Sequence, residues 1–152
     1  ARADRIEHRS DRTFALLDYK TGYPPTGKQV RMGLAPQLTL EAAILKNGGF
    51  DGIPAGASVS ELVYVRLSGN SPPGEEKTLE LKINRGEQAQ YPDDAADEAL
   101  RKLGDLIRKF DNGAQSYTSL NLSMWANRYG KYDDLARIKE WSAGGGANGG
   151  EE

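Results

Sequence analysis

The stretch Thr13–Lys20, TFALLDYK, carries the pattern on which the rest of the fold depends. It follows a turn at Ser10–Arg12 and is rich in apolar and aromatic residues, which predicts a β-strand whose one face holds Phe14, Leu16, Asp18 and Lys20. Asp18 and Lys20 are two residues apart, so their side chains point the same way, roughly 6–7 Å apart along the strand. The strand therefore presents a carboxylate and an ammonium group on one side.

The preceding stretch, Ala1–His8 with the sequence ARADRIEH, alternates and predicts another strand. If the two strands pair around the intervening turn, the numbers of opposed residues add to about 22. Ile6 then shares a face with Leu16, as burial requires, and Asp4 faces Asp18. Like charges directly opposite one another destabilise a sheet, so this pairing requires something that offsets the repulsion.

A divalent cation would offset it, with hard oxygen ligands from Asp4, Asp18 and the backbone carbonyl of Tyr19. Lys20 would then lie beside the cation, where its charge could stabilise negative charge that develops in a reaction. From these residues alone a second interpretation stays open: Asp and Lys on a strand commonly form a solvated face, with Asp4 paired to a neighbouring arginine.

A helix is predicted from Pro36, a residue suited to a first helical position, through QLTLEAAILKN to Gly48. Gln37 and Glu41 are four residues apart and lie on one face of this helix. That face could look toward the same carboxylates.

The other elements complete a mixed α and β pattern. We expect loops at TGYPPTG and at Ser68–Glu76, and a buried strand at Ser60–Leu67. A further strand is expected at Thr78–Ile83, with its apolar side chains turned inward. A helix from Asp93 or Asp94 to Phe110 has one apolar stripe, formed by Ala96, Leu100, Leu103, Ile107 and Phe110. A last short helix is predicted around Tyr132–Trp141.

The composition excludes several classes of site. The 152 residues include no cysteine and one histidine, which excludes disulfides, thiolate zinc sites, an iron–sulfur cluster and a multi-histidine metal site. Any metal must use carboxylates and carbonyls, which suits magnesium or manganese. No stretch is long and apolar enough to span a membrane, and the charged N-terminal segment is unlike a signal peptide. We therefore expect a cytoplasmic protein with no membrane partner.

Four segments in this order resemble a known family: RADRIE, DYKTGYPPT, GLAPQLTLEAAIL and YGKYDDLARIKEWS. They are similar to the RecB-like branch of the PD-(D/E)XK nucleases, and within it to the C-terminal nuclease domain of the alphaproteobacterial AddB family. The resemblance implies an α/β fold of the restriction-endonuclease type, with a mixed central sheet flanked by helices. The family's N-terminal helix would lie upstream, so the chain is expected to be a fragment. The nuclease domain would cover residues 1–142, followed by a disordered Gly-rich tail at 143–152.

The same resemblance implies roles for individual residues. Asp4 and Asp18 match the metal-binding aspartates, Lys20 the lysine of the D-x-K pair, and Gln37 the helix glutamine that supports the site. With Tyr19 providing its carbonyl, these residues would hold Mg²⁺ or Mn²⁺. Glu41 stands where many RecB-like members have tyrosine.

The function implied is a metal-dependent DNA exonuclease domain of a helicase-nuclease complex in double-strand break repair and recombination. An AddA-like helicase-nuclease subunit would deliver single strands to it. Weak DNA contacts are expected from Arg5 and from Lys28 and Arg31, which are placed in the loop before the helix. The first 50 residues carry eight Lys/Arg against five Asp/Glu, although the net charge is −2. The alternative is an inactive DNA-binding or scaffolding module of the same fold.

Overall fold

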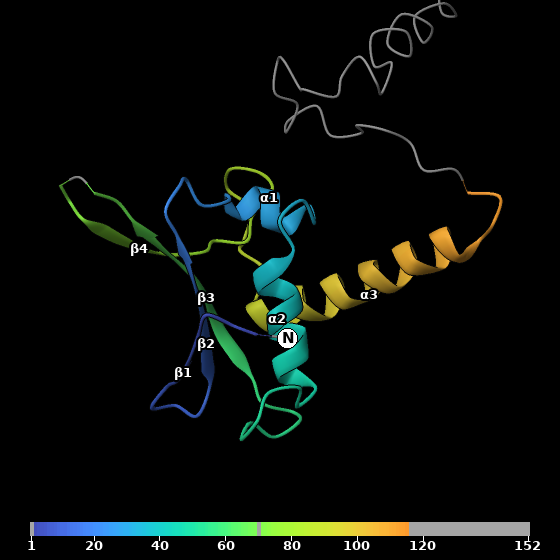
Figure 1. Ribbon diagram of the computed structural model, residues 1–152, viewed down its shortest axis with the longest axis horizontal. Helices are drawn as coiled ribbons and strands as arrows, with labels where there is room; N and C mark the ends of the chain where they lie inside the picture. The colour runs from blue at the N-terminus through green and yellow to red at the C-terminus, as the bar shows by residue number, and fades with distance from the viewer. Residues whose placement is uncertain (1, 70, 116–152) are drawn as a thin grey trace, which may run out of the picture. The chain divides into compact units, whose positions relative to one another are not determined.

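A computed structural model describes residues 2–69 and 71–115. The chain divides into two compact units, residues 1–108 and 109–152, of which the second is described only at 109–115. The described elements are β1 (Arg5–His8), β2 (Phe14–Lys20), α1 (Gly27–Arg31), α2 (Gln37–Lys46), β3 (Val59–Leu67), β4 (Gly74–Thr78) and α3 (Pro92–Asp111) (Figure 1). The predicted boundary at residue 142 and the predicted helix at 132–141 lie outside the described residues.

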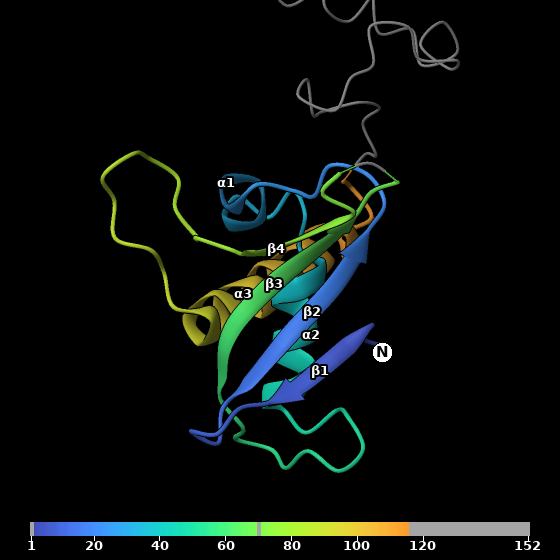
Figure 2. The ribbon, with the colours of Figure 1, turned by 90° about the vertical axis from the view of Figure 1, so that its left-hand side faces the viewer.

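One four-stranded mixed sheet, in the order β1–β2–β3–β4, organises the first unit. Strand β2 pairs antiparallel with β1 and parallel with β3, and β4 is antiparallel to β3. Helix α2 lies in the connection between the two parallel strands, and α2 and α3 lie behind the sheet in Figure 2. The predicted mixed α/β arrangement is confirmed.

The predicted register of the first hairpin is also confirmed, because Ile6 pairs with Leu16 and Arg5 with Leu17. Strand β1 is shorter than expected, however, and Asp4 lies just before it. The reason is local: the amide of Tyr19 donates to Asp4 Oδ2 at 3.1 Å. The backbone amide of Tyr19 in β2 thus donates to a side-chain oxygen at this point and not to a backbone carbonyl of the first strand.

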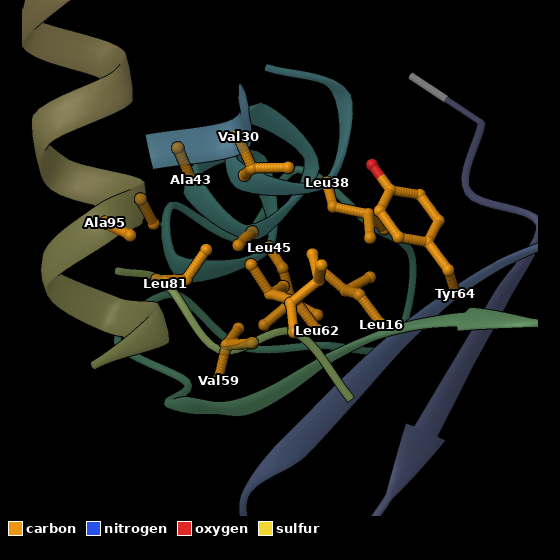
Figure 3. Packing of buried hydrophobic residues seen from close by; sticks show 13 residues of the cluster. Leu16, Val30, Leu38, Ala43, Leu45, Val59, Leu62, Tyr64, Leu81 and Ala95 are labelled. Carbon is orange, nitrogen blue, oxygen red and sulfur yellow. The ribbon is translucent and has the colours of Figure 1, made fainter. Parts of the chain in front are cut away.

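The main core lies between the sheet and the helices (Figure 3). It is built mainly from Leu16, Leu62 and Tyr64 of the sheet and from apolar residues of α2, with Ala95 and Ala96 from α3. On the other side of the sheet, a smaller apolar cluster consists of Ala15, Leu17, Val63 and Val65. Because side chains alternate along a strand, β2 contributes its even-numbered residues to the helix-covered face.

Helix α2 agrees with its predicted bounds, since Pro36 is its N-cap residue and it ends at Lys46. Gly48 has a φ of 73°, the left-handed conformation expected just after a helix. The predicted loop before α2 is wrong in part, because Gly27–Arg31 form helix α1. Thr26 and Gln29 cap this helix reciprocally, which is a local helix signal. The prediction gave more weight to the nearby glycines and prolines.

The strand predicted at Thr78–Ile83 is wrong except at Thr78, since β4 covers Gly74–Thr78 and begins inside the predicted loop. Leu79 and Leu81 are still buried, so the alternating pattern marked burial and not a strand. Just beyond β4 the chain lies against the first residue of α1. A Cβ on Gly27 would lie 1.8 Å from the carbonyl oxygen of Glu80, which shows how closely the two backbones approach.

Helix α3 is longer than predicted by a residue at each end, but its apolar stripe is mostly uncovered. Ala96 is fully buried, whereas Leu100, Leu103 and Ile107 are 37–52% exposed. No helix among the described residues is both long and apolar enough to cross a membrane.

Candidate active site

The candidate site lies where the C-terminal half of β2 meets the first turn of α2. Alternation along β2 turns Asp18 toward the helix-covered face, where its side chain is 1% exposed. Gln37 is the first residue of α2, and its side chain reaches the same point. A buried carboxylate requires partners, because removing an unpaired charge from water is costly.

Asp18, Lys20 and Gln37 form a closed triangle of polar contacts, named here the site triangle. Gln37 Nε2 donates to Asp18 Oδ1 at 2.7 Å, and Lys20 Nζ donates to Gln37 Oε1 at 3.1 Å. Lys20 Nζ also lies 2.6 Å from Asp18 Oδ2, as an ion pair. The amide of Gln37 thus turns its donor toward the carboxylate and its acceptor toward the ammonium group, which fixes both charges.

Asp4 lies directly before β1, and the hairpin register, continued by one residue from the pair Arg5–Leu17, sets it opposite Asp18. Both carboxylates have partners within the chain, which the repulsion argument did not include. Asp4 accepts the amide of Tyr19, and Asp18 is ion-paired with Lys20 and accepts from Gln37. These hydrogen bonds and the opposite charge offset part of the like-charge repulsion between Asp4 and Asp18.

Glu41 joins the site one turn further along α2. Its side chain is buried, and Gln37 Nε2 lies within hydrogen-bond distance of Glu41 Oε1 at 3.3 Å. Burial raises the pKa of Glu41, and the negative charges of Asp18 and Asp4 raise it further. The sequence held the signal, four-residue spacing from Gln37, but spacing does not show that the position is buried.

Beneath the site triangle lies a buried tyrosine. Tyr64 pairs with Asp18 across β2 and β3, and Lys20 Nζ lies 5.9 Å from the centre of its ring. Burial raises the pKa of Tyr64, and the charges of Asp18 and Glu41 act in the same direction. Sequence reasoning missed this residue because only the parallel register brings it next to Asp18.

The donor chemistry fits a hard divalent cation. Asp18 Oδ2 and Glu41 Oε2 are buried carboxylate oxygens without a hydrogen-bond partner among the described residues, although Lys20 is ion-paired with the first. Within residues 2–69 and 71–115, no three His, Asp or Glu side chains are close enough to form a metal site alone. Carbonyls, water or a phosphate of the substrate would have to complete the coordination.

The three predicted DNA-contacting residues do not gather at the site triangle. Arg5 pairs with Leu17, on the other face of the sheet from Asp18, and is bonded to Glu7 and the Tyr19 hydroxyl. Lys28 and Arg31 lie on α1 and not in a loop. Arg31 is ion-paired with Glu98 of α3 at 2.8 Å, so part of its charge is used within the fold.

Part of the sequence is similar to known proteins of Rickettsia. An uncharacterized protein of Rickettsia conorii is 48% identical over 48 residues, which is 32% of this chain and 6% of that protein. One from Rickettsia felis is 47% identical over 49 residues, with the same shares. The match thus spans a small part of much longer relatives. No solved structure matches the chain.

The model of the PD-(D/E)XK nuclease superfamily matches residues 1–120, which include both strands of the hairpin and α2. The mixed sheet flanked by helices is consistent with the restriction-endonuclease-like fold of that superfamily. Since the match covers most of its length, the chain belongs to the PD-(D/E)XK nuclease superfamily.

Proposed function

We propose that this chain is a metal-dependent DNA exonuclease domain that hydrolyses phosphodiester bonds through Asp4, Asp18, Lys20 and Gln37. Membership of the superfamily supports nuclease chemistry, and members generally use divalent metal ions. The observation that carries the proposal is the site triangle, in which a buried carboxylate, an ammonium group and an amide hold one another in place.

In this proposal Asp4, Asp18 and the carbonyl of Tyr19 hold Mg²⁺ or Mn²⁺, which would polarise the phosphodiester group. Lys20 directs its positive charge to the phosphate and stabilises the additional negative charge of the transition state. Gln37 keeps the Lys20 ammonium group and the Asp18 carboxylate in a fixed orientation, so neither must reorganise during the reaction. The low exposure of Asp18 strengthens these interactions by excluding water.

We further propose that the domain works in the cytoplasm within a helicase-nuclease complex in double-strand break repair and recombination. An AddA-like subunit would deliver single strands to it. Two observations support this assignment: the motifs RADRIE, DYKTGYPPT and GLAPQLTLEAAIL resemble AddB, and the Rickettsia relatives are far longer than this chain.

The test is single-turnover cleavage of end-labelled single-stranded DNA by excess protein, with Mg²⁺, Mn²⁺ or a chelator. The wild-type chain should release labelled products only with a cation. Asp18→Asn should lower the rate at least about 1,000-fold, because it removes a ligand and the counter-charge of Lys20. Asp51→Asn, an exposed aspartate outside the site, is the matched control.

Isothermal titration of Mn²⁺ into the same proteins provides the second readout. Asp18→Asn and Asp4→Asn should each weaken cation binding at least about tenfold, in the manner of a lost ligand. Cleavage that persists in Asp18→Asn would overturn the assignment. DNA binding without cation-dependent cleavage by the wild type would favour the inactive binding module instead.

A further inference from the structure

An aromatic ring and a guanidinium group lie together where β2 and β3 end. Lys20 and Arg66 are register partners in the parallel pair, so their side chains leave the same face of the sheet. Tyr23 follows β2 by three residues, and the Arg66 guanidinium carbon lies 4.3 Å from the centre of its ring. The pair is therefore the next feature along the sheet from the site triangle.

The Tyr23 ring is unusual in its exposure. Its side chain is 87% exposed, the highest value among the exposed large hydrophobic residues of the described chain. A cation–π contact at such an exposed place contributes only about 0.5–1 kcal/mol. The contact with Arg66 orients the ring, but most of its surface stays open to solvent.

Arg66 has no ion-pair partner in the part of the chain that the structure describes. Its Nε is buried without a hydrogen-bond partner among the described residues. Glu75 is its register partner on β4, yet within residues 2–69 and 71–115 no carboxylate lies at ion-pair distance from Arg66. By contrast, Arg5, Arg9 and Arg31 are all ion-paired. The charge of Arg66 is thus available to an anion from outside the chain.

We propose that Tyr23 and Arg66 form a nucleotide subsite beside Lys20 for single-stranded nucleic acid. An unpaired base stacks on the Tyr23 ring, and Arg66 contacts the neighbouring phosphate. This inference rests on the proposed function and extends it by assigning where the strand lies next to the reacting phosphate. Neighbouring strands are about 4.8 Å apart, so a phosphate at Lys20 leaves the next nucleotide within reach of Arg66.

The chemistry matches what single strands require. Proteins that bind them without reading sequence combine cationic groups that follow the backbone with aromatic rings on which bases stack. Every base has a flat face, so one tyrosine can serve any sequence. A base within a duplex is already stacked and paired, so the subsite would favour unpaired strands.

The test is a binding cycle measured by fluorescence anisotropy in chelator and low salt, where nothing is cleaved. A single-stranded oligonucleotide is compared with the same backbone made of abasic nucleotides. Tyr23→Ala should raise the Kd for the normal oligonucleotide at least about fivefold, since base stacking on an aromatic ring is worth that factor or more. Tyr23→Phe keeps the ring and should bind as the wild type does.

The abasic strand distinguishes stacking from a general loss of binding. The wild type should bind it at least about fivefold more weakly than the normal strand, and Tyr23→Ala should bind both alike. Arg66→Ala should weaken both strands equally and lower the salt slope by about 0.7, the value of one single-strand phosphate contact. Binding of blunt duplex DNA should not change in Tyr23→Ala.

Tyr91→Ala is the matched control, because Tyr91 is 70% exposed and directly precedes α3. It should leave every Kd within twofold of the wild type. A Tyr23→Ala protein that melts as the wild type does and binds the normal oligonucleotide within twofold would overturn the subsite. The same holds if Tyr23→Ala loses equal affinity for the abasic strand.

Failure of the subsite and failure of the proposed function give different results. If Asp18→Asn abolishes cleavage while Tyr23→Ala binds normally, the nuclease assignment stands and only the subsite falls. If Asp18→Asn still cleaves, the proposed function falls, whatever the binding cycle shows.

Discussion

Helices α2 and α3 contribute to the same core but differ in how much of each helix is buried. Six of the ten residues of α2 are buried, whereas in the twenty residues of α3 only Ala95 and Ala96 are. Yet α3 has the clearer apolar stripe in the sequence. A stripe shows that a helix has an apolar face and says nothing about whether that face is covered.

The comparison also explains why the helical residues of the candidate site are on α2 and not on α3. A helix buried on most sides holds polar side chains only where they find partners, because an unsatisfied buried group costs about 1–3 kcal/mol. Glu41 is such a buried polar residue, and its neighbour Gln37, exposed at the first turn of α2, donates to the carboxylates of both Asp18 and Glu41. Polar residues of α3 are mostly exposed and carry no such constraint.

The largest expected effect is the loss of an apolar side chain from α2. Leu45 is fully buried, so Leu45→Ala should lower the free energy of unfolding by about 2–5 kcal/mol, through lost burial and the cavity left behind. Urea denaturation followed by circular dichroism measures it. A change below about 1 kcal/mol would show that α2 is not the helix on which the core depends.

Next in size is the effect of removing the amide that links the strand to the helix. Gln37→Leu keeps the volume but leaves Lys20 and Asp18 held only by each other, so cleavage should fall about 10–100-fold. Binding of Mn²⁺ should change less than about threefold, because Asp18 keeps its carboxylate. Gln88→Leu, an exposed glutamine outside the site and outside the helices, is the glutamine control; cleavage that falls equally in both variants would contradict the role given to Gln37.

The first hairpin and α2 could be predicted from the sequence, because the residues that determine them are close together in the chain. Ile6 and Leu16 fixed the hairpin register, and Pro36 and Gly48 bounded α2. The remainder depends on residues distant in the chain. Gly27 approaches Glu80 from a distant part of the chain, and Glu41 is buried only because α2 packs on the sheet. The contact between Tyr23 and Arg66 arises only from the parallel register.

The structure also changes one expectation about Asp18. Opposition to Asp4 alone predicts that removing either carboxylate leaves the metal-free fold as stable or more stable. Asp18 is instead ion-paired with Lys20 and bonded by Gln37. We expect Asp18→Ala to destabilise the metal-free protein, because the Gln37 amide and the Lys20 ammonium group both lose the carboxylate to which they are bonded.

A smaller effect concerns Glu41 and depends on pH. Its pKa in the folded state is raised above the unfolded value of 4.5, mainly by burial. The folded protein therefore binds more protons than the unfolded chain just above pH 4.5, and stability falls as the pH rises through the folded pKa. Glu41→Gln removes this penalty.

The variant should therefore be more stable than the wild type at pH 7 by on the order of 1 kcal/mol, and the difference should shrink as the pH falls toward 4.5. Urea denaturation at pH 4, 5, 6 and 7 measures the difference at each step. Glu75→Gln is a suitable control, because Glu75 is an exposed glutamate on β4. A difference that stays constant with pH would show that Glu41 is not penalised by its charge.

The smallest effect tests the uncovered face of α3. Ile107 is 52% exposed, so truncating its side chain removes little buried surface. Alanine also has a higher helix propensity than isoleucine, by a few tenths of a kcal/mol, which offsets the lost contact. Ile107→Ala should thus leave the free energy of unfolding within about 0.5 kcal/mol of the wild type. Ile107→Gly separates the two contributions: it should cost about 1 kcal/mol more than alanine through backbone entropy alone. If Ile107→Ala instead costs as much as Leu45→Ala, the face is covered in solution, and the contrast between the two helices disappears.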